Sequence, residues 1–195
     1  MKNLLLIAGL LIMILHSTIS QASIIKVDIE LDKVSYQQDD IIYAQLVVRD
    51  FSQALGGFFS MLNFQSNNLS LLDWQFGAGF DDGLTYEKAL TNSLYLEEYS
   101  WASTDENTLK SFQGSQFTLA SFSFKALTAG THLLSFEQGS SGLLDFDFGD
   151  VVAQFSGTSI LVADNTSTPV PEPKTLALFF GGLLLLQIKR KKVSL

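Results

Sequence analysis

The chain has 195 residues, 47% of them hydrophobic, no cysteine and a formal net charge of −8. Without cysteine the chain has no disulfide framework. With only two histidines and no cysteine, catalytic triads and His-rich metal sites are nearly excluded. Residues 23–168 carry six Lys and Arg against 19 Asp and Glu, a net charge of −13, which makes nucleic acid an unfavourable partner.

The N-terminal residues predict export. Lys2 makes the first residues positively charged, and residues 4–15 are an apolar stretch of 12 residues. Ser20 and Ala22 are small residues at the two positions that signal peptidase recognises. The stretch is too short for a membrane-spanning helix, which needs about 20 apolar residues. We therefore expect residues 1–22 to be a signal peptide that signal peptidase removes, and the following domain to lie outside the cytoplasm.

Residues 23–163 predict one all-β domain. Short runs of β-branched, aromatic and aliphatic residues alternate with polar ones, which is the period of a half-buried strand. We expect an antiparallel β-sandwich of jelly-roll type with about nine strands, flanked by the N-terminal signal helix and a C-terminal hydrophobic helix. The expected strands are residues 24–31, 40–48, 57–64, 69–76, 93–101, 116–127, 131–136, 143–148 and 151–162, with loops at 77–83 and 103–114.

The alternation also predicts which side chains enter the core. In one strand Phe122 and Phe124 share the inner face, with serines between them on the outer face. In another, Leu72, Trp74 and Phe76 share a face.

Two stretches of this domain, residues 55–69 and 119–131, resemble cohesin-type domains, which are nine-stranded jelly-roll relatives of carbohydrate-binding modules. Within them, Gly56 and Gly57 would supply a tight turn, and Ala129-Gly130-Thr131 would form a hairpin turn.

The resemblance has one departure. Phe64-Gln65-Ser66 stands where many cohesin-type domains have Phe-Asp-Pro. The fold should survive this change, but dockerin binding does not follow from the resemblance, and no binding residue is carried over.

The polar residues of the domain give little support for catalysis. His132 falls on the apolar face of a short strand and is expected to be a partly buried structural residue. A carboxylate pair drawn from Glu97, Glu98, Asp145 and Asp147 could support glycoside hydrolysis, but strand alternation explains these residues more simply. We expect no enzyme activity.

The acidic residues Asp145, Asp147 and Asp150 surround Gly149 in a pattern that faintly resembles a calcium loop. Hard oxygen ligands at alternate positions suit Ca²⁺, and a chain reversal at Gly149 could bring the three carboxylates together. The alternative is an ordinary solvated strand, with Phe146 and Phe148 in the core.

Aromatic residues offer a candidate ligand-binding stripe. Tyr95, Tyr99 and Trp101 share one strand face with Glu97, and exposed flat rings are suited to packing against sugars. The alternative is that this stripe belongs to the core, with Leu94 and its neighbour Leu96 on the outer face.

The C-terminal segment consists of three successive parts. A linker, residues 164–174, contains all three prolines of the chain and is expected to be extended. Residues 175–188 are uncharged and apolar, and we expect them to form a transmembrane helix of about 21 Å, shorter than the roughly 30 Å hydrocarbon core of a membrane. The tail, residues 189–195, begins with the basic cluster Lys189, Arg190, Lys191 and Lys192, which marks the cytoplasmic side.

These parts in this order resemble the PEP-CTERM sorting signal of Gram-negative bacteria, in which Pro171, Glu172 and Pro173 are the sorting motif. The resemblance implies a precursor held in the inner membrane, processing by the membrane enzyme exosortase near this motif, and an outer-surface or exopolysaccharide destination. The alternative is a plain membrane anchor with a Pro-rich stalk.

Two functions remain open at this point. One is a non-catalytic surface or extracellular-matrix protein that associates with exopolysaccharide through a carbohydrate-binding-like β-sandwich. The other is a cohesin-type module that binds another surface protein through a dockerin-like domain.

Overall fold

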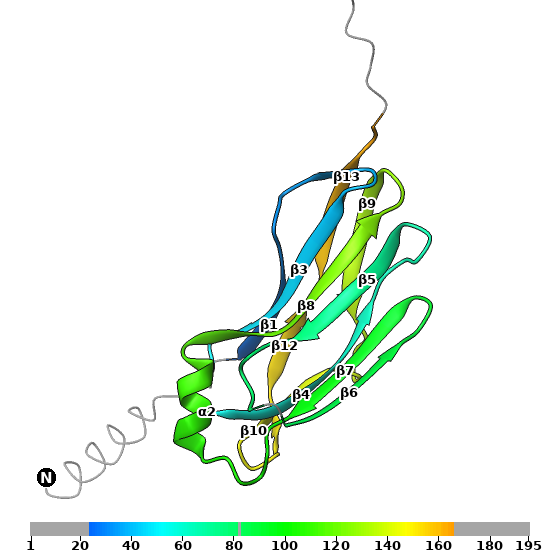
Figure 1. Ribbon diagram of the computed structural model, residues 1–195. Helices are drawn as coiled ribbons and strands as arrows, with labels where there is room; N and C mark the ends of the chain where they lie inside the picture. The colour runs from blue at the N-terminus through cyan, green and yellow to red at the C-terminus, as the bar shows by residue number, and fades with distance from the viewer. Residues whose placement is uncertain (1–23, 82, 166–195) are drawn as a thin grey trace, which may run out of the picture. The chain divides into compact units, whose positions relative to one another are not determined.

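The computed structural model describes residues 24–81 and 83–165, which fold into two β-sheets packed face to face (Figure 1). The first sheet has five strands in the order β12-β1-β3-β8-β5. Their bounds are Ala153–Ser156 for β12, Ile25–Leu31 for β1, Ile41–Arg49 for β3, Gln116–Ala126 for β8 and Leu69–Phe76 for β5.

The second sheet has eight strands, six of them in the order β11-β10-β4-β9-β13-β2, with β7 pairing along β4 and β6 pairing along β7. β6 therefore forms an edge of this sheet. The bounds are Tyr36–Gln37 for β2, Leu55–Asn63 for β4, Leu84–Ala89 for β6, Ser93–Tyr99 for β7, Gly130–Phe136 for β9, Gly142–Asp145 for β10, Asp150–Val151 for β11 and Thr158–Ala163 for β13.

Most strand pairs are antiparallel, but two are parallel. Ala153 of β12 lies opposite Ile25 of β1, and Val162 of β13 lies opposite Tyr36 of β2. Both pairs join a segment near the start of the domain to one near its end, because parallel neighbours need a long connection rather than a hairpin. The predicted all-β sandwich is confirmed, and its mainly antiparallel sheets include these two parallel pairs.

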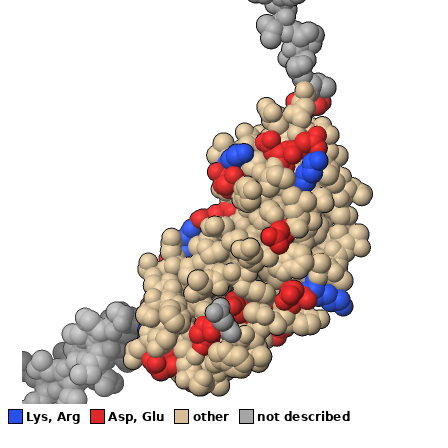
Figure 2. All heavy atoms as spheres, viewed as in Figure 1, with Lys and Arg blue, Asp and Glu red and all other residues tan. Residues whose placement is uncertain are grey.

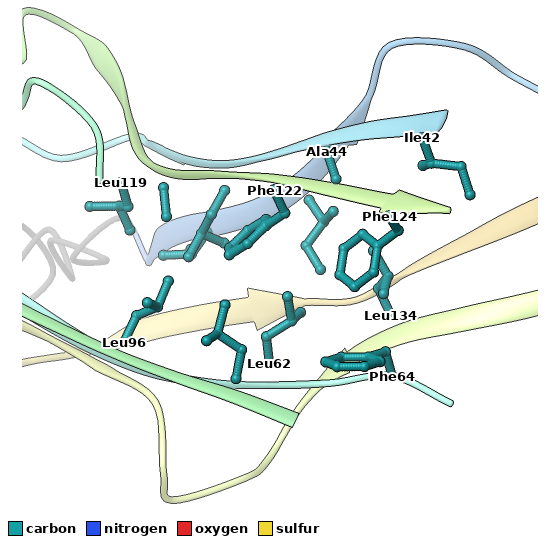
Figure 3. Packing of buried hydrophobic residues seen from close by; sticks show 14 of the residues in the cluster. Ile42, Ala44, Leu62, Phe64, Leu96, Leu119, Phe122, Phe124 and Leu134 are labelled. Carbon is teal, nitrogen blue, oxygen red and sulfur yellow. The ribbon is translucent and has the colours of Figure 1, made fainter. Parts of the chain in front are cut away.

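The core lies between the two sheets and is apolar and rich in aromatic rings. Figure 3 shows Phe122 and Phe124 of β8 facing Leu62 of β4, Leu96 of β7 and Phe64, which directly follows β4. Phe124 is fully buried, and its ring centroid lies 5.3 Å from that of Phe64. The predicted inner face of β8 is thus confirmed, and burial of this apolar surface supplies the main stabilisation in a chain without disulfides.

A short helix, α2 (Glu106–Gln113), occupies the region where a loop was predicted. The Asp105 carboxylate caps it by accepting the backbone N–H groups of Asn107 and Thr108 at 3.1 Å each. Its eight residues make about two turns, too few for a helical period to stand out in the sequence.

Several strands differ from their predicted bounds. Gly56 and Gly57 lie inside β4 rather than in a turn.

A register shift in β5 between Leu71 and Asp73 places Leu72 outside the alternation. Leu72 is therefore exposed, while Trp74 packs against the core. The short strands β2 and β6 were not predicted, and the last predicted strand, residues 151–162, is divided among β11, β12 and β13.

The chain separates into a compact unit that ends at Ala163 and a second unit that begins at Asp164, of which Asp164 and Asn165 are described. Within the described residues no helix is long and apolar enough to cross a membrane. The predicted signal peptide, the Pro-Glu-Pro motif, the apolar segment 175–188 and the basic tail all lie outside the described residues.

Candidate functional site

Strand β7 turns its aromatic residues outward. Leu94 and Leu96 are buried in the core, and Tyr95 and Tyr99 lie on the opposite face of the strand, half-buried. The interpretation of the aromatic stripe as core is therefore wrong. The stripe faces solvent because the first sheet covers only the leucine side of β7.

Neighbouring strands extend this stripe into a surface. Tyr86 of β6 lies opposite Glu97 of β7, and its ring centroid is 5.9 Å from that of Tyr95. At the other end, the Tyr99 ring lies 6.3 Å from the ring of Phe148, in the turn between β10 and β11. Tyr86 and Phe148 are 52% and 40% exposed. We call this surface, made of Tyr86, Tyr95, Glu97, Tyr99 and Phe148, the tyrosine face.

Glu97 stands at the centre of the tyrosine face and holds two of its rings. The Tyr95 hydroxyl donates a hydrogen bond to one Glu97 oxygen at 2.9 Å, and the Tyr99 hydroxyl donates to the other. Burial, followed by the hydrogen bond and the negative charge of Glu97, raises the pKa of Tyr95 to about 12. The same causes raise the pKa of Tyr99 well above its ordinary value. The rings are thus fixed before any ligand arrives.

Two glycines let aromatic rings lie close against the backbone of this face. Gly57 of β4 pairs with Tyr99, and a Cβ atom at Gly57 would come within 2.6 Å of the Tyr99 ring. Gly142 of β10 pairs with Phe59, and a Cβ atom there would come within 2.5 Å of the Phe59 ring. The surface therefore depends on small residues from strands distant in sequence, which sequence reasoning missed.

Trp101 continues the tyrosine face beyond the end of β7. Its side chain is 49% exposed, and its backbone N–H donates to the Asp81 carboxylate at 3.0 Å. Together with Phe148 and Asp147 it lines a shallow hollow of about 220 Å³. The structure thus brings Tyr95, Tyr99 and Trp101 to one side of the sandwich.

The three predicted calcium ligands lie in and beside the hairpin turn between β10 and β11. The predicted strand ends at Asp145, whose carboxylate accepts the backbone N–H groups of Asp147 at 3.0 Å and of Gly149 at 2.7 Å. Asp150 is already in β11. Within residues 24–81 and 83–165, no group of three or more His, Cys, Asp and Glu side chains is placed to hold a metal ion. Phe148, expected in the core, is instead exposed in this turn with φ of 62°.

The remaining polar candidates do not form a catalytic arrangement. Glu97 points outward, whereas Glu98 is buried, so these two carboxylates lie on opposite faces of β7 and cannot flank one bond. His132, predicted to be a partly buried structural residue, is buried, with Nε2 2.7 Å from the carbonyl oxygen of Thr128.

The surface of the domain is acidic. In the view of Figure 2, Asp and Glu side chains are spread over the molecule among few Lys and Arg. On the tyrosine face and its margin the charged groups include Glu97, Asp147 and Asp81, with Lys88 opposite Tyr95 on β6. This side of the molecule therefore favours a ligand with basic groups.

The sequence matches no protein-family model and no curated protein. The fold, however, is that of cohesin domains. A non-cellulosomal cohesin from the hyperthermophilic archaeon Archaeoglobus fulgidus is 12% identical, with a TM-score of 0.57 over 74% of this chain and 94% of that chain. A type II cohesin domain from the cellulosome of Acetivibrio cellulolyticus is 16% identical, with a TM-score of 0.59 over 70% and 95%.

A type I cohesin–dockerin complex from Clostridium thermocellum is also similar, at 13% identity and a TM-score of 0.60, covering 76% of this chain and 99% of that chain. At these identities the likeness establishes a cohesin-like β-sandwich and no more.

Proposed function

We propose that the protein is a non-catalytic recognition module that binds a protein partner through the tyrosine face. The observation that carries this proposal is a set of half-exposed aromatic rings, fixed around Glu97, on the solvent side of a sheet. Tyrosine is enriched at the energetic centres of protein interfaces, and rings that are already ordered lose little entropy on binding.

The proposed partner is a folded domain with a basic, partly apolar surface. The net charge of −13 over residues 23–168 and the carboxylates around the face complement Lys and Arg on such a partner. One of the similar structures is a cohesin–dockerin complex, so a dockerin-like domain is the partner class to test first.

The alternative, polysaccharide binding at Tyr95, Tyr99 and Trp101, has less support at this site. A sugar needs free hydrogen-bonding groups beside the rings. The hydroxyls of Tyr95 and Tyr99 and both oxygens of Glu97 instead bond to one another. The face thus offers mainly apolar ring surface, which suits a protein partner.

Affinity measurements on two outward-facing tyrosines test the proposal. The partner is captured from the producing cells on the full-length protein, purified, and titrated against the wild type and the variants Tyr86→Ala and Tyr43→Ala. Tyr86 belongs to the tyrosine face, whereas Tyr43 lies on the outer face of the other sheet with similar exposure. Tyr86→Ala should weaken binding about 30-fold, the effect of a 2 kcal/mol hot spot, and Tyr43→Ala should leave it unchanged.

The comparison also shows when the proposal fails. Equal affinities for the wild type and Tyr86→Ala would place the interface elsewhere. A dissociation constant that does not rise with salt would contradict the proposed basic partner, because interactions between exposed charges are screened.

We propose further that the protein is exported and sorted to the cell surface. The support is the sequence alone: the signal peptide of residues 1–22, the motif Pro171-Glu172-Pro173, the short apolar segment and the basic cluster after it. Exosortase would then remove the segment and the tail.

Mass spectrometry of the mature surface protein tests the sorting step. We expect a C-terminus near Pro173 in the wild type, and unprocessed precursor in the inner membrane for Glu172→Ala. An intact Leu195 on the mature surface form, in cells with active exosortase, would contradict processing, and a plain anchor would be insensitive to Glu172→Ala.

A further inference from the structure

The outer face of the five-stranded sheet carries a trough along β8. In register across the sheet, Ser123 of β8 lies between Tyr43 of β3 and Asp73 of β5. One row further, Ser121 lies between Gln45 and Gln75. Because serine is small, the surface along β8 lies lower than the side chains of β3 and β5 on either side of it.

This hollow measures about 180 Å³ and is lined in part by Tyr43, Asp73, Gln75, Ser121 and Ser123, which we call the serine trough. Its volume is below the roughly 300 Å³ at which pockets for drug-sized ligands begin. It therefore fits one ring of a longer chain better than it fits an enclosed small molecule.

The polar side chains of the serine trough make no hydrogen bond to another described residue. Tyr43 bonds to Asp32 through its backbone groups, and its hydroxyl makes no hydrogen bond within the described residues. The side chains of Asp73, Gln75 and both serines likewise make no hydrogen bond within residues 24–81 and 83–165. Hydroxyl, amide and carboxylate groups thus converge on one hollow with their bonding capacity open to a ligand. The tyrosine face differs, because its polar groups bond to one another.

The composition of the trough selects a ligand class. The Tyr43 ring is 58% exposed and offers a flat apolar surface at one wall. The single charge that lines the hollow is the Asp73 carboxylate, and Lys125, opposite Ser70 at one end, forms an ion pair with Asp39 at 2.8 Å. An anionic chain would therefore be repelled by the Asp73 carboxylate. A neutral sugar ring presents the hydroxyls and the apolar face that these groups complement.

We infer that the serine trough binds a neutral polysaccharide along β8. The sandwich then carries two ligand faces on opposite sheets, a sugar-binding trough on one and the tyrosine face on the other. The inference does not depend on the proposed protein partner, because the two faces share no residue.

Affinity electrophoresis of the purified full-length chain tests the inference. Native gels contain hydroxyethylcellulose, glucomannan or dextran, with alginate as the anionic control and a gel without polysaccharide as the reference. The protein is kept in a detergent without a sugar headgroup, because a maltoside would compete for the trough. At least one neutral polysaccharide should retard the wild type, and alginate should not.

Three variants localise the binding. Tyr43→Ala removes the exposed ring, and Ser121→Gln fills the trough without removing it; each should raise the dissociation constant at least tenfold. Tyr86→Ala, on the other sheet, should leave the retardation unchanged. Unaltered circular dichroism of each variant shows that the fold is retained.

The inference is overturned if none of the three neutral polysaccharides retards the wild type, if alginate retards it equally, or if Tyr43→Ala and Ser121→Gln are retarded like the wild type. Loss of retardation in Tyr86→Ala alone would assign the sugar to the tyrosine face instead, and would count against both this inference and the proposed function.

Discussion

Tyr95 and Tyr99 share the Glu97 carboxylate, and this sharing has a consequence for stability at high pH. A phenol is neutral while it keeps its proton, and burial beside a carboxylate favours that neutral form. The pKa of Tyr95 is therefore about 12 in the folded protein, against an ordinary value of 10.0. The raised pKa adds stability that is fully present below pH 10 and is lost as the pH rises through about 12.

Glu97→Gln should shift this alkaline loss to lower pH, because the amide removes the negative charge that opposes phenolate formation. The test compares the pH dependence of the free energy of unfolding, followed together with phenolate absorbance, in wild type and variant. Glu87→Gln, on the exposed edge strand β6, is the matched control. Identical alkaline profiles for all three proteins would show that Glu97 does not hold the tyrosines.

At the scale of elements, Gln113 joins α2 to the sandwich through hydrogen bonds, beside the buried side chain of Leu109. The Gln113 side chain is buried, accepts the Leu55 N–H at 2.9 Å, and donates to the carbonyl oxygens of Leu55 at 2.7 Å and of Gly79 at 3.2 Å. It thereby connects the helix, the start of β4 and the loop before β6. These backbone groups are buried where water cannot replace the missing bonds.

Gln113→Ala should lower the free energy of unfolding by about 2–4 kcal/mol, because it leaves more than one buried backbone group without a partner. Urea denaturation measures the change. Asn107→Ala, an exposed amide on the same helix, should stay within about 0.5 kcal/mol of the wild type. A loss below about 1 kcal/mol for Gln113→Ala would mean that α2 is not joined in this way.

The elements that alternation predicted are those covered on one face only. β8 is an example, with Phe122 and Phe124 inside and serines outside. β6 carries no such signal, because all six of its residues are exposed. The bulge at Leu72 and the division of residues 151–162 depend on neighbouring strands, and no local pattern reports them.

The sequence also predicted only the local part of the candidate site. Spacing alone placed Tyr95 and Tyr99 on one face of a strand, and the structure keeps them there. Which face was buried depended on the opposite sheet. The roles of Gly57 and Phe148 depend on contacts between segments about 40 residues or more apart in the sequence, as with Gly57 and Tyr99. The serine trough needs three strands in register, which sequence alternation cannot supply.

At the scale of the whole molecule, the two outer faces of the sandwich differ in how they use their polar groups. On the tyrosine face these groups fix rings in place, which leaves apolar surface outward. In the serine trough they remain open to a ligand. We propose that a module with these two faces, exported as its sequence predicts, holds a protein partner beside polysaccharide.

The central claim is that the protein partner binds the tyrosine face, and site-specific photo-crosslinking in the producing cells tests it most directly. A benzophenone amino acid replaces Tyr86 in one full-length protein and Tyr43 in another, two positions of similar exposure on opposite sheets. We predict a covalent adduct with the purified and identified partner from position 86 and none from position 43. An adduct from position 43 alone, or equal adducts from both positions, would contradict the claim.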